Sequence, residues 1–175
     1  MNDSLFLIVK TATDLYASLL LVRLLLQLVQ ADFYNPISQT ILKICAPVVE
    51  PLHRLLPTFG RFNTAVLVAA LLVKWLCYLA LAAIAGVLAG NHWVYLSIAF
   101  FDLLRLLIEI YFWGIFILVL SSWVGTGMHP AVALVSQIVE PYLRPFRKLI
   151  PPVGMIDISP MVAIFTLMII RAQVL

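Results

Sequence analysis

Charged residues recur inside long apolar stretches of this 175-residue chain. Lys10 and Asp14 are four residues apart, as are Arg105 and Glu109, so each pair would share one face of a helix. Asp102 precedes Arg105 by three residues and extends the second pair. An ionisable group near the centre of a bilayer costs roughly 2.5–3.5 kcal/mol, so each is expected to find a partner. We predict an intramembrane polar cluster in which the tyrosines supply hydrogen bonds, formed by Lys10, Asp14, Tyr16, Lys74, Asp102, Arg105, Glu109 and Tyr111.

Two interpretations of this cluster remain open from the residues alone. The charges could line a polar seam that handles an ion or a proton. Alternatively, they could hold helices together, or lie near the membrane interface and extend toward it. Lys10 and Arg171 lie near the ends of their apolar stretches, which favours the structural interpretation for both. Asp14, Lys74 and Glu109 lie deeper, where either interpretation applies.

Enzyme signatures are absent from the sequence. It contains no G-x-S-x-G, no phosphate-binding loop and no H-E-x-x-H motif. His53, His92 and His129 fall in three separate connections, and the two cysteines form no C-x-x-C pair. We therefore predict a protein that is not an enzyme, with no catalytic residue, no metal site, no cofactor and no nucleic-acid partner.

The elements that must carry the charges follow from composition. Apolar residues make up 64% of the chain and charged residues 11%, against about 45–50% and 25% in a soluble domain. The sequence therefore predicts an all-α membrane protein. A spanning helix needs about 20 apolar residues, and the sequence predicts four transmembrane helices: Leu5–Val29, Ala65–Ala89, Val94–Val124 and Met161–Leu175. The third is long enough to tilt or to split in two, and the fourth is marginal and could be re-entrant.

The basic residues predict the topology. The linkers Gln30–Asn63 and Gly125–Asp157 carry three Lys or Arg each, whereas Gly90–Trp93 carries none. The positive-inside rule then places both linkers in the cytoplasm and both termini outside it, in a multi-pass protein of the bacterial inner membrane. Anionic lipid headgroups are the expected contacts of four linker cations: Arg54, Arg144, Arg147 and Lys148.

The sequence also predicts a tandem duplication, with two repeats at residues 5–89 and 94–175 that enter the membrane in the same direction. Lys10, Asp14 and Tyr16 are matched 95 residues later by Arg105, Glu109 and Tyr111, and seven linker identities recur at an offset of 94. Prolines and glycines dominate these identities, which makes chance recurrence improbable. The turn and kink positions predicted from the two copies are Asn35, Pro36, Pro47, Pro51, Pro57, Gly60, Pro130, Pro141, Pro145, Pro151 and Gly154.

Each linker is predicted to form an amphipathic helix. Asn35-Pro36 and His129-Pro130 would begin these helices, because proline is tolerated in the first turn. Pro47 and Pro51 interrupt the apolar stripe, which predicts two short helices with a kink. The stripe could lie in the headgroup plane, pack on the spanning helices, or do both.

These motifs resemble the YggT family, also called YlmG, of small bacterial and plastid membrane proteins. The resemblance rests on Asp32-Phe33-Tyr34-Asn35-Pro36, on the P-x-x-x-P pairs, and on P-x-x-G-x-[IF]-[ND] in both copies. The second copy departs from the pattern, with Gly127-Met128-His129-Pro130 in place of D-F-Y-N-P. The match covers nearly the whole chain.

The resemblance implies roles in osmotic stress tolerance, in division-linked gene clusters and in the assembly of a plastid cytochrome complex. It carries over no catalytic residues. We therefore expect a non-enzymatic inner-membrane factor that supports envelope protein assembly or organisation and osmotic stress tolerance, with other membrane proteins as partners. The alternative is a small potassium- or proton-handling protein, which would act as a homo-oligomer because four helices leave little room for a path.

Overall fold

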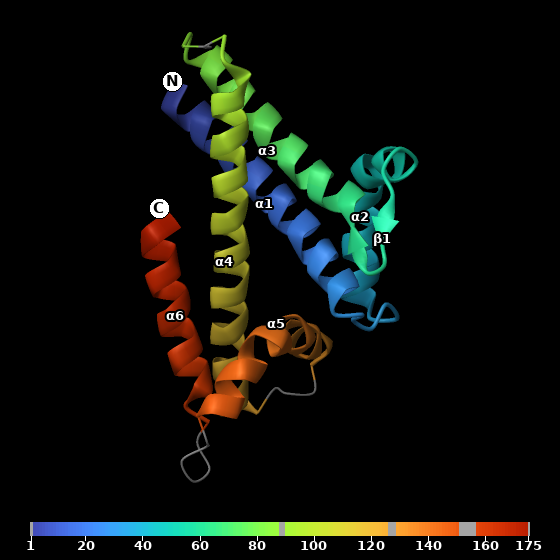
Figure 1. The fold of residues 1–175 in the computed structure, drawn as a ribbon, viewed down its shortest axis with the longest axis vertical. Helices are drawn as coiled ribbons and strands as arrows, with labels where there is room; N and C mark the ends of the chain where they lie inside the picture. The colour runs from blue at the N-terminus through green and yellow to red at the C-terminus, as the bar shows by residue number, and fades with distance from the viewer. Residues whose placement is uncertain (1, 88–89, 126–128, 151–156, 175) are drawn as a thin grey trace.

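The computed structural model describes residues 2–87, 90–125, 129–150 and 157–174. Apart from one short hairpin, the elements are helices, which confirms the all-α prediction (Figure 1). In chain order they are α1 (Asn2–Leu28), α2 (Pro36–His53), β1 (Thr58–Phe59), β2 (Phe62–Asn63), α3 (Thr64–Ile84), α4 (His92–Val124), α5 (Pro130–Leu149) and α6 (Ser159–Val174).

Among the described residues, three helices are long and apolar enough to cross a membrane: α1, α3 and α4. The fourth predicted span corresponds to α6, whose 16 residues extend only about 24 Å, short of a hydrocarbon core of about 30 Å. The stretch predicted as Val94–Val124 forms one helix of 33 residues rather than two pieces. Its length of about 50 Å exceeds the whole bilayer, so α4 must tilt or protrude.

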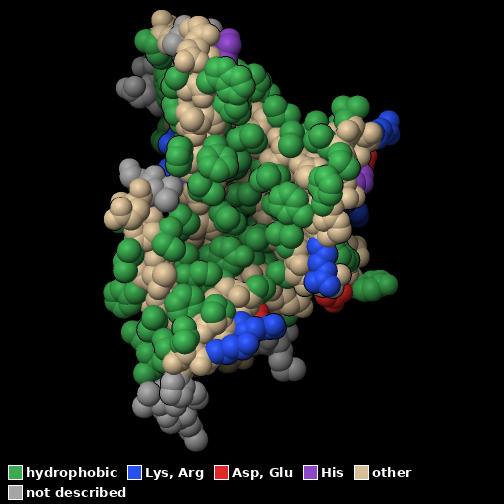
Figure 2. Space-filling model, in the orientation of Figure 1, with side chains coloured by type: hydrophobic (Ala, Val, Ile, Leu, Met, Phe, Trp, Pro, Cys, Tyr) green, Lys and Arg blue, Asp and Glu red, His purple; other side chains and the backbone are tan. Residues whose placement is uncertain are grey.

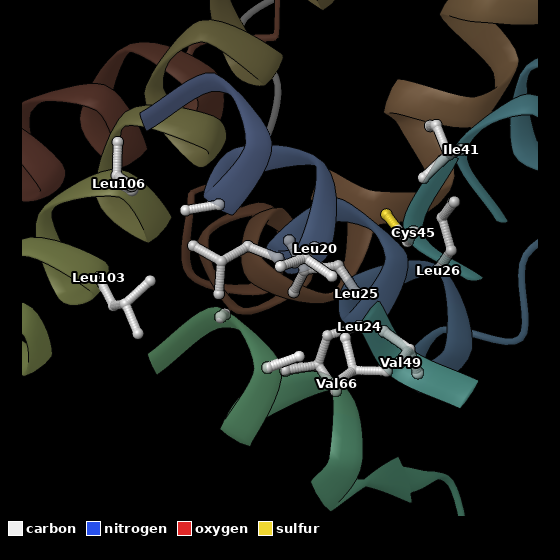
Figure 3. Packing of buried hydrophobic residues seen from close by; sticks show 14 of the residues in the cluster. Leu20, Leu24, Leu25, Leu26, Ile41, Cys45, Val49, Val66, Leu103 and Leu106 are labelled. Atoms are coloured by element: carbon white, nitrogen blue, oxygen red, sulfur yellow. The ribbon is translucent and has the colours of Figure 1, made fainter. Parts of the chain in front are cut away.

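The main core forms where α1 packs against α3 and α2. Leu20 and Leu24 on α1 meet Val66 on α3 and Val49 on α2 in the interior shown in Figure 3. Leu103 and Leu106 close the same core from α4. The long helices are thus packed through regularly spaced leucines on one face of α1.

A second core joins α4, α5 and α6 through Ile115, Val139, Leu143, Ala163 and Leu167. Gly114 permits the close approach of α4 to α5, because a Cβ atom there would lie 2.7 Å from Val139 Cγ2. In Figure 1, α5 lies across the end of α4 that is remote from the α3–α4 connection, and α2 lies at the corresponding end of α1 and α3.

The predicted division of the linker into two short helices is wrong. The structure has one α-helix, α2, through Pro47 and Pro51, and another, α5, through Pro141 and Pro145. Prolines four residues apart lie on one face, and all four are exposed. The hydrogen bonds that they remove therefore fall on the exposed side. The opposite face of each helix is buried, and this packing holds the helix together.

Local signals at the linker ends are borne out where the structure describes them. The Asn35 side chain caps α2 by accepting a hydrogen bond from Ile37 N at 2.9 Å. Its amide also donates to the Pro130 carbonyl at 2.9 Å, which ties the start of α2 to the start of α5. Gly60 has φ +59° in the β1–β2 turn, a conformation that glycine adopts cheaply. Pro151 and Gly154 lie outside the described residues.

Candidate intramembrane charge site

The most deeply buried charge is Lys74 of α3, whose side chain has 0% exposure. Its ammonium group forms ion pairs with Asp14 of α1 and Asp102 of α4. The Tyr78 hydroxyl donates a 2.7 Å hydrogen bond to Asp102 Oδ2, the same oxygen that pairs with Lys74. The Lys74 ammonium also lies 5.2 Å from the centroid of the Tyr78 ring, within range of a cation–π interaction. One lysine therefore links three spanning helices.

The ion pairs continue from this lysine along α4. Arg105 lies 3.6 Å from Asp102, and its Nε lies 3.1 Å from Glu109 Oε1. Glu109 in turn lies 3.6 Å from Arg171 of α6. Three acids and three bases thus connect α1, α3, α4 and α6, and their formal charges balance. We call this set the charge ladder: Asp14, Lys74, Asp102, Arg105, Glu109 and Arg171.

The ladder differs from the predicted cluster in its pairing. Asp14 pairs with Lys74 across two helices rather than with Lys10 on its own helix. The reason is the packing of α3 along α1, which brings the Lys74 ammonium to Asp14. The predicted Arg105–Glu109 pair within one helix is present.

The two predicted tyrosine partners bind elsewhere. Tyr16 donates a 3.4 Å hydrogen bond to the Ile44 carbonyl of α2, and the Tyr111 ring packs against Tyr142 of α5 with centroids 5.4 Å apart. Tyr78 takes the expected role and was missed from sequence. The available signal was its position one helical turn after Lys74, which places both on one face of α3.

Lys10 lines a pocket beside the ladder instead of joining it. The pocket has a volume of about 350 Å³ and lies between α1, α3 and α4. Its lining consists of Lys10, Tyr78, Ser97, Ile98, Phe101, Asp102 and Arg105. Within the described ranges, Lys10 forms no side-chain ion pair.

Arg23, a further charge near the end of α1, joins α1 to α2. Its guanidinium donates a 3.2 Å hydrogen bond to the Leu42 carbonyl. Arg23 Nε and Gln27 Oε1 are buried and have no hydrogen-bond partner among the described residues. This arginine is therefore held by the linker helix rather than by the charge ladder.

The four linker cations predicted to contact lipid headgroups fall into two kinds. Arg54, Arg144 and Lys148 are exposed. Arg147 is exposed as well, but it forms ion pairs within the protein, at 2.5 Å from Glu140 and 3.1 Å from Asp157. Asp157 also accepts hydrogen bonds from the Ser159 backbone and hydroxyl, and so caps α6. Partial burial tends to raise the pKa of Asp157, but the bonds from Ser159 and Arg147 outweigh it and hold that pKa below its ordinary value.

The described residues contain no group of three or more His, Cys, Asp or Glu side chains that could hold a metal ion. The site is therefore an arrangement of fixed, mutually compensating charges with a pocket at one side. Such an arrangement can brace helices or present charge within an apolar layer.

Comparison with known proteins identifies the family. The CCB3/YggT family model matches residues 2–84 and 97–175. The chain belongs to the CCB3/YggT family. YggT of Escherichia coli K12 is 33% identical over 174 residues, which cover 99% of this chain and 90% of that protein. The uncharacterized protein PA0392 of Pseudomonas aeruginosa is 37% identical over 177 residues, covering 100% of this chain and 90% of the relative.

An uncharacterized protein of Vibrio alginolyticus is a further YggT relative, 36% identical over 165 residues that cover 93% of this chain and 88% of its own length. No solved structure matches the chain. The names of these relatives specify no reaction and no ligand.

Proposed function

We propose that this YggT-family chain is a non-enzymatic, multi-pass factor of the bacterial inner membrane that supports the assembly or organisation of envelope proteins. Osmotic stress tolerance would be the cellular outcome. The observation that carries the proposal is the doubly paired, fully buried Lys74. A lysine closed between Asp14 and Asp102 fixes three helices relative to one another, as a rigid membrane platform requires.

The surface supports a membrane setting for this platform. Figure 2 shows hydrophobic side chains covering the visible face over α4 and α6, with Lys and Arg gathered near α5 and α2. Trp93 and Trp123 lie near opposite ends of α4, and their side chains are 78% and 80% exposed. They are 30 residues apart, or about 45 Å along the helix. This is close to the bilayer thickness of about 40–45 Å including the interfacial regions, where tryptophan is enriched.

The linker helices supply the proposed lipid contact. On α5, Leu134, Ile138, Val139 and Leu143 are buried on one face. Arg144 and Lys148 are exposed on the same helix, and Arg54 is exposed at the end of α2. Each cation near an anionic surface contributes about 1 kcal/mol of binding. We propose that these three cations contact anionic headgroups.

Ion handling by an oligomer is the second candidate function. The observation that favours it is the continuity of the ladder from buried Lys74 to Arg171, which is 44% exposed. A path for potassium or protons would need Asp14 or Glu109 to change its charge or its partner, whereas a brace needs both to stay paired.

Proteoliposomes containing the purified protein distinguish the two candidates. The platform predicts potassium and proton fluxes equal to those of protein-free vesicles, both for the wild type and for Asp14→Asn. In cells lacking the gene, the platform predicts lower levels of some envelope proteins and poorer growth at high osmolarity. A flux that is present in the wild type and lost in Asp14→Asn would favour ion handling and contradict the platform.

A further inference from the structure

We infer that the pocket beside the charge ladder binds the carboxylate of an Asp or Glu side chain on a spanning helix of a partner membrane protein. This inference rests on the proposed assembly function and names the chemistry of the partner. The pocket is the 350 Å³ space lined by Lys10, Asp102 and Arg105 together with Tyr78, Ser97, Ile98 and Phe101.

The pocket carries a positive charge that the charge ladder does not balance. The acids and bases of the ladder balance, so Lys10 is an additional positive charge at the pocket. Within the described part of the chain its ammonium has no ion-pair partner. Asp102 attracts Lys10, but it is already paired with Lys74 and Arg105 and bonded by Tyr78, so its single negative charge is shared among several cations. A carboxylate supplies one negative charge, which Lys10 requires.

The pocket extends some distance into the membrane along α4. Ser97 lies five residues and Arg105 thirteen residues beyond His92, the first residue of α4. At 1.5 Å per residue, the pocket reaches from about 8 Å to about 20 Å along α4. Its deeper part therefore lies within the apolar layer, where a carboxylate on a neighbouring helix can reach more readily than a lipid phosphate can.

Exposed apolar side chains lie in the pocket lining on α4 and close to Lys10 in sequence on α1. Ile98 and Phe101 on α4 are 41% and 56% exposed, and Leu7 and Ile8 on α1 are 68% and 64% exposed. Apolar side chains on two helices, with a cation between them, present a surface that fits an apolar helix carrying one acid. Interhelical polar contacts of this kind strengthen helix association in lipid.

The test uses synthetic spanning peptides as probes. Each peptide is rich in Leu and Ala and carries Glu, Gln or Leu at one position about eight to ten residues from the end that adjoins the α3–α4 connection. The full-length protein is labelled at Val87→Cys, whose position is 68% exposed. Energy transfer to a labelled peptide in phosphatidylcholine vesicles then measures association.

We expect the Glu peptide to associate about fivefold to tenfold more tightly than the Gln or Leu peptide. Lys10→Met should reduce this preference to less than twofold, and Lys10→Arg should retain it. Lys43→Met is the matched control, because it removes an exposed cation from α2 and should leave the preference unchanged.

Equal association of all three peptides with the wild-type protein would overturn the inference, and this comparison does not depend on the folding of any variant. Loss of the Glu preference when phosphatidylglycerol is added would also overturn it, since a lipid phosphate would then occupy the pocket. Either result leaves the envelope phenotype of the deletion strain intact. The absence of that phenotype would instead contradict the proposed function.

Discussion

At the scale of single residues, the stability of this protein depends on each buried charge having a partner of opposite charge. Lys74 is entirely buried, yet it has two carboxylates and an aromatic ring around it. Removing one member of a buried pair leaves the other uncompensated, whereas removing both is much milder. Lys74 and its acids therefore offer a direct measure of whether the ladder serves as a brace.

Lys74→Met should lower the free energy of unfolding by about 3–5 kcal/mol, because it leaves Asp14 without its cation. Lys74→Met combined with Asp14→Leu should be more stable than Lys74→Met alone, since Asp102 keeps Arg105 and Tyr78. Asp14→Asn alone should be mild, because Lys74 keeps Asp102. Thermal unfolding in detergent measures all three, with Lys43→Met as an exposed control. A double variant as unstable as Lys74→Met would contradict the brace.

Asp157 makes the junction between α5 and α6 sensitive to acid. Its pKa is held below the ordinary value, so its contribution to stability is complete above the unfolded-state pKa of about 3.9. That contribution disappears as the pH falls through the lower folded-state pKa. The Arg147 contact is exposed, so we expect a modest effect of about 0.2–1 kcal/mol.

The unfolding temperature of Asp157→Asn should therefore fall below that of the wild type at pH 7, and the difference should shrink toward pH 2.5. Comparing the two proteins at each pH cancels the titration of every other acid. A difference that stays constant from pH 7 to pH 2.5 would show that the carboxylate charge does not stabilise the junction.

At the scale of elements, α4 and α5 approach each other closely where Gly114 faces Val139. Val139 is 1% exposed and belongs to the core shared with α6. Because its γ-methyl group would lie 2.7 Å from a Cβ at position 114, no larger residue fits there unless the Val139 side chain or the helices move. This contact fixes the linker helix against the longest spanning helix.

Gly114→Ala should destabilise the protein by about 1–3 kcal/mol through overpacking. Adding Val139→Ala should recover part of that loss, because it removes the methyl groups that clash. Gly90→Ala is the matched control, since no atom lies within 4 Å of a Cβ there. Thermal unfolding of the four proteins forms a double-mutant cycle, and strict additivity of the two changes would contradict direct contact.

At the scale of the whole molecule, the α3–α4 connection lies at one end of the long helices, and the two linker helices, α2 and α5, lie at the other end (Figure 1). Two spanning helices between the linkers would put both linkers on one side of the membrane. The positive-inside rule assigns that side to the cytoplasm, because both linkers carry basic residues. The same arrangement would expose the α3–α4 connection outside.

Cysteine labelling in intact cells tests this topology. A membrane-impermeant maleimide should label Val87→Cys from outside, and should label Thr58→Cys and Leu149→Cys only after the cells are opened. All three positions are exposed, whereas the native Cys45 and Cys77 are buried and should give little background. Labelling of Thr58→Cys or Leu149→Cys from outside would contradict a shared cytoplasmic side.

The sequence by itself determined the helical membrane class, the starts of the linker helices and the glycine turn at Gly60. These features depend on composition and on neighbouring residues: apolar runs predict membrane helices, Asn35 caps the adjacent turn, and positive φ favours glycine. The sequence also singled out Asp14, Lys74, Asp102, Arg105 and Glu109, because charges stand out in apolar helices. It did not place Arg171 in the cluster, since the contact of α6 with Glu109 is a tertiary one.

Only the tertiary structure decided which charges meet. Spacing along α1 predicted that Lys10 would pair with Asp14, but Asp14 pairs with Lys74, which is 60 residues away. That choice depends on how α1 and α3 pack, and the periodicity of one helix carries no information about its neighbour. The continuity of α2 through two prolines was decided in the same way. Local propensity opposes a helix there, but burial of Ile41, Cys45 and Val49 on the opposite face stabilises it.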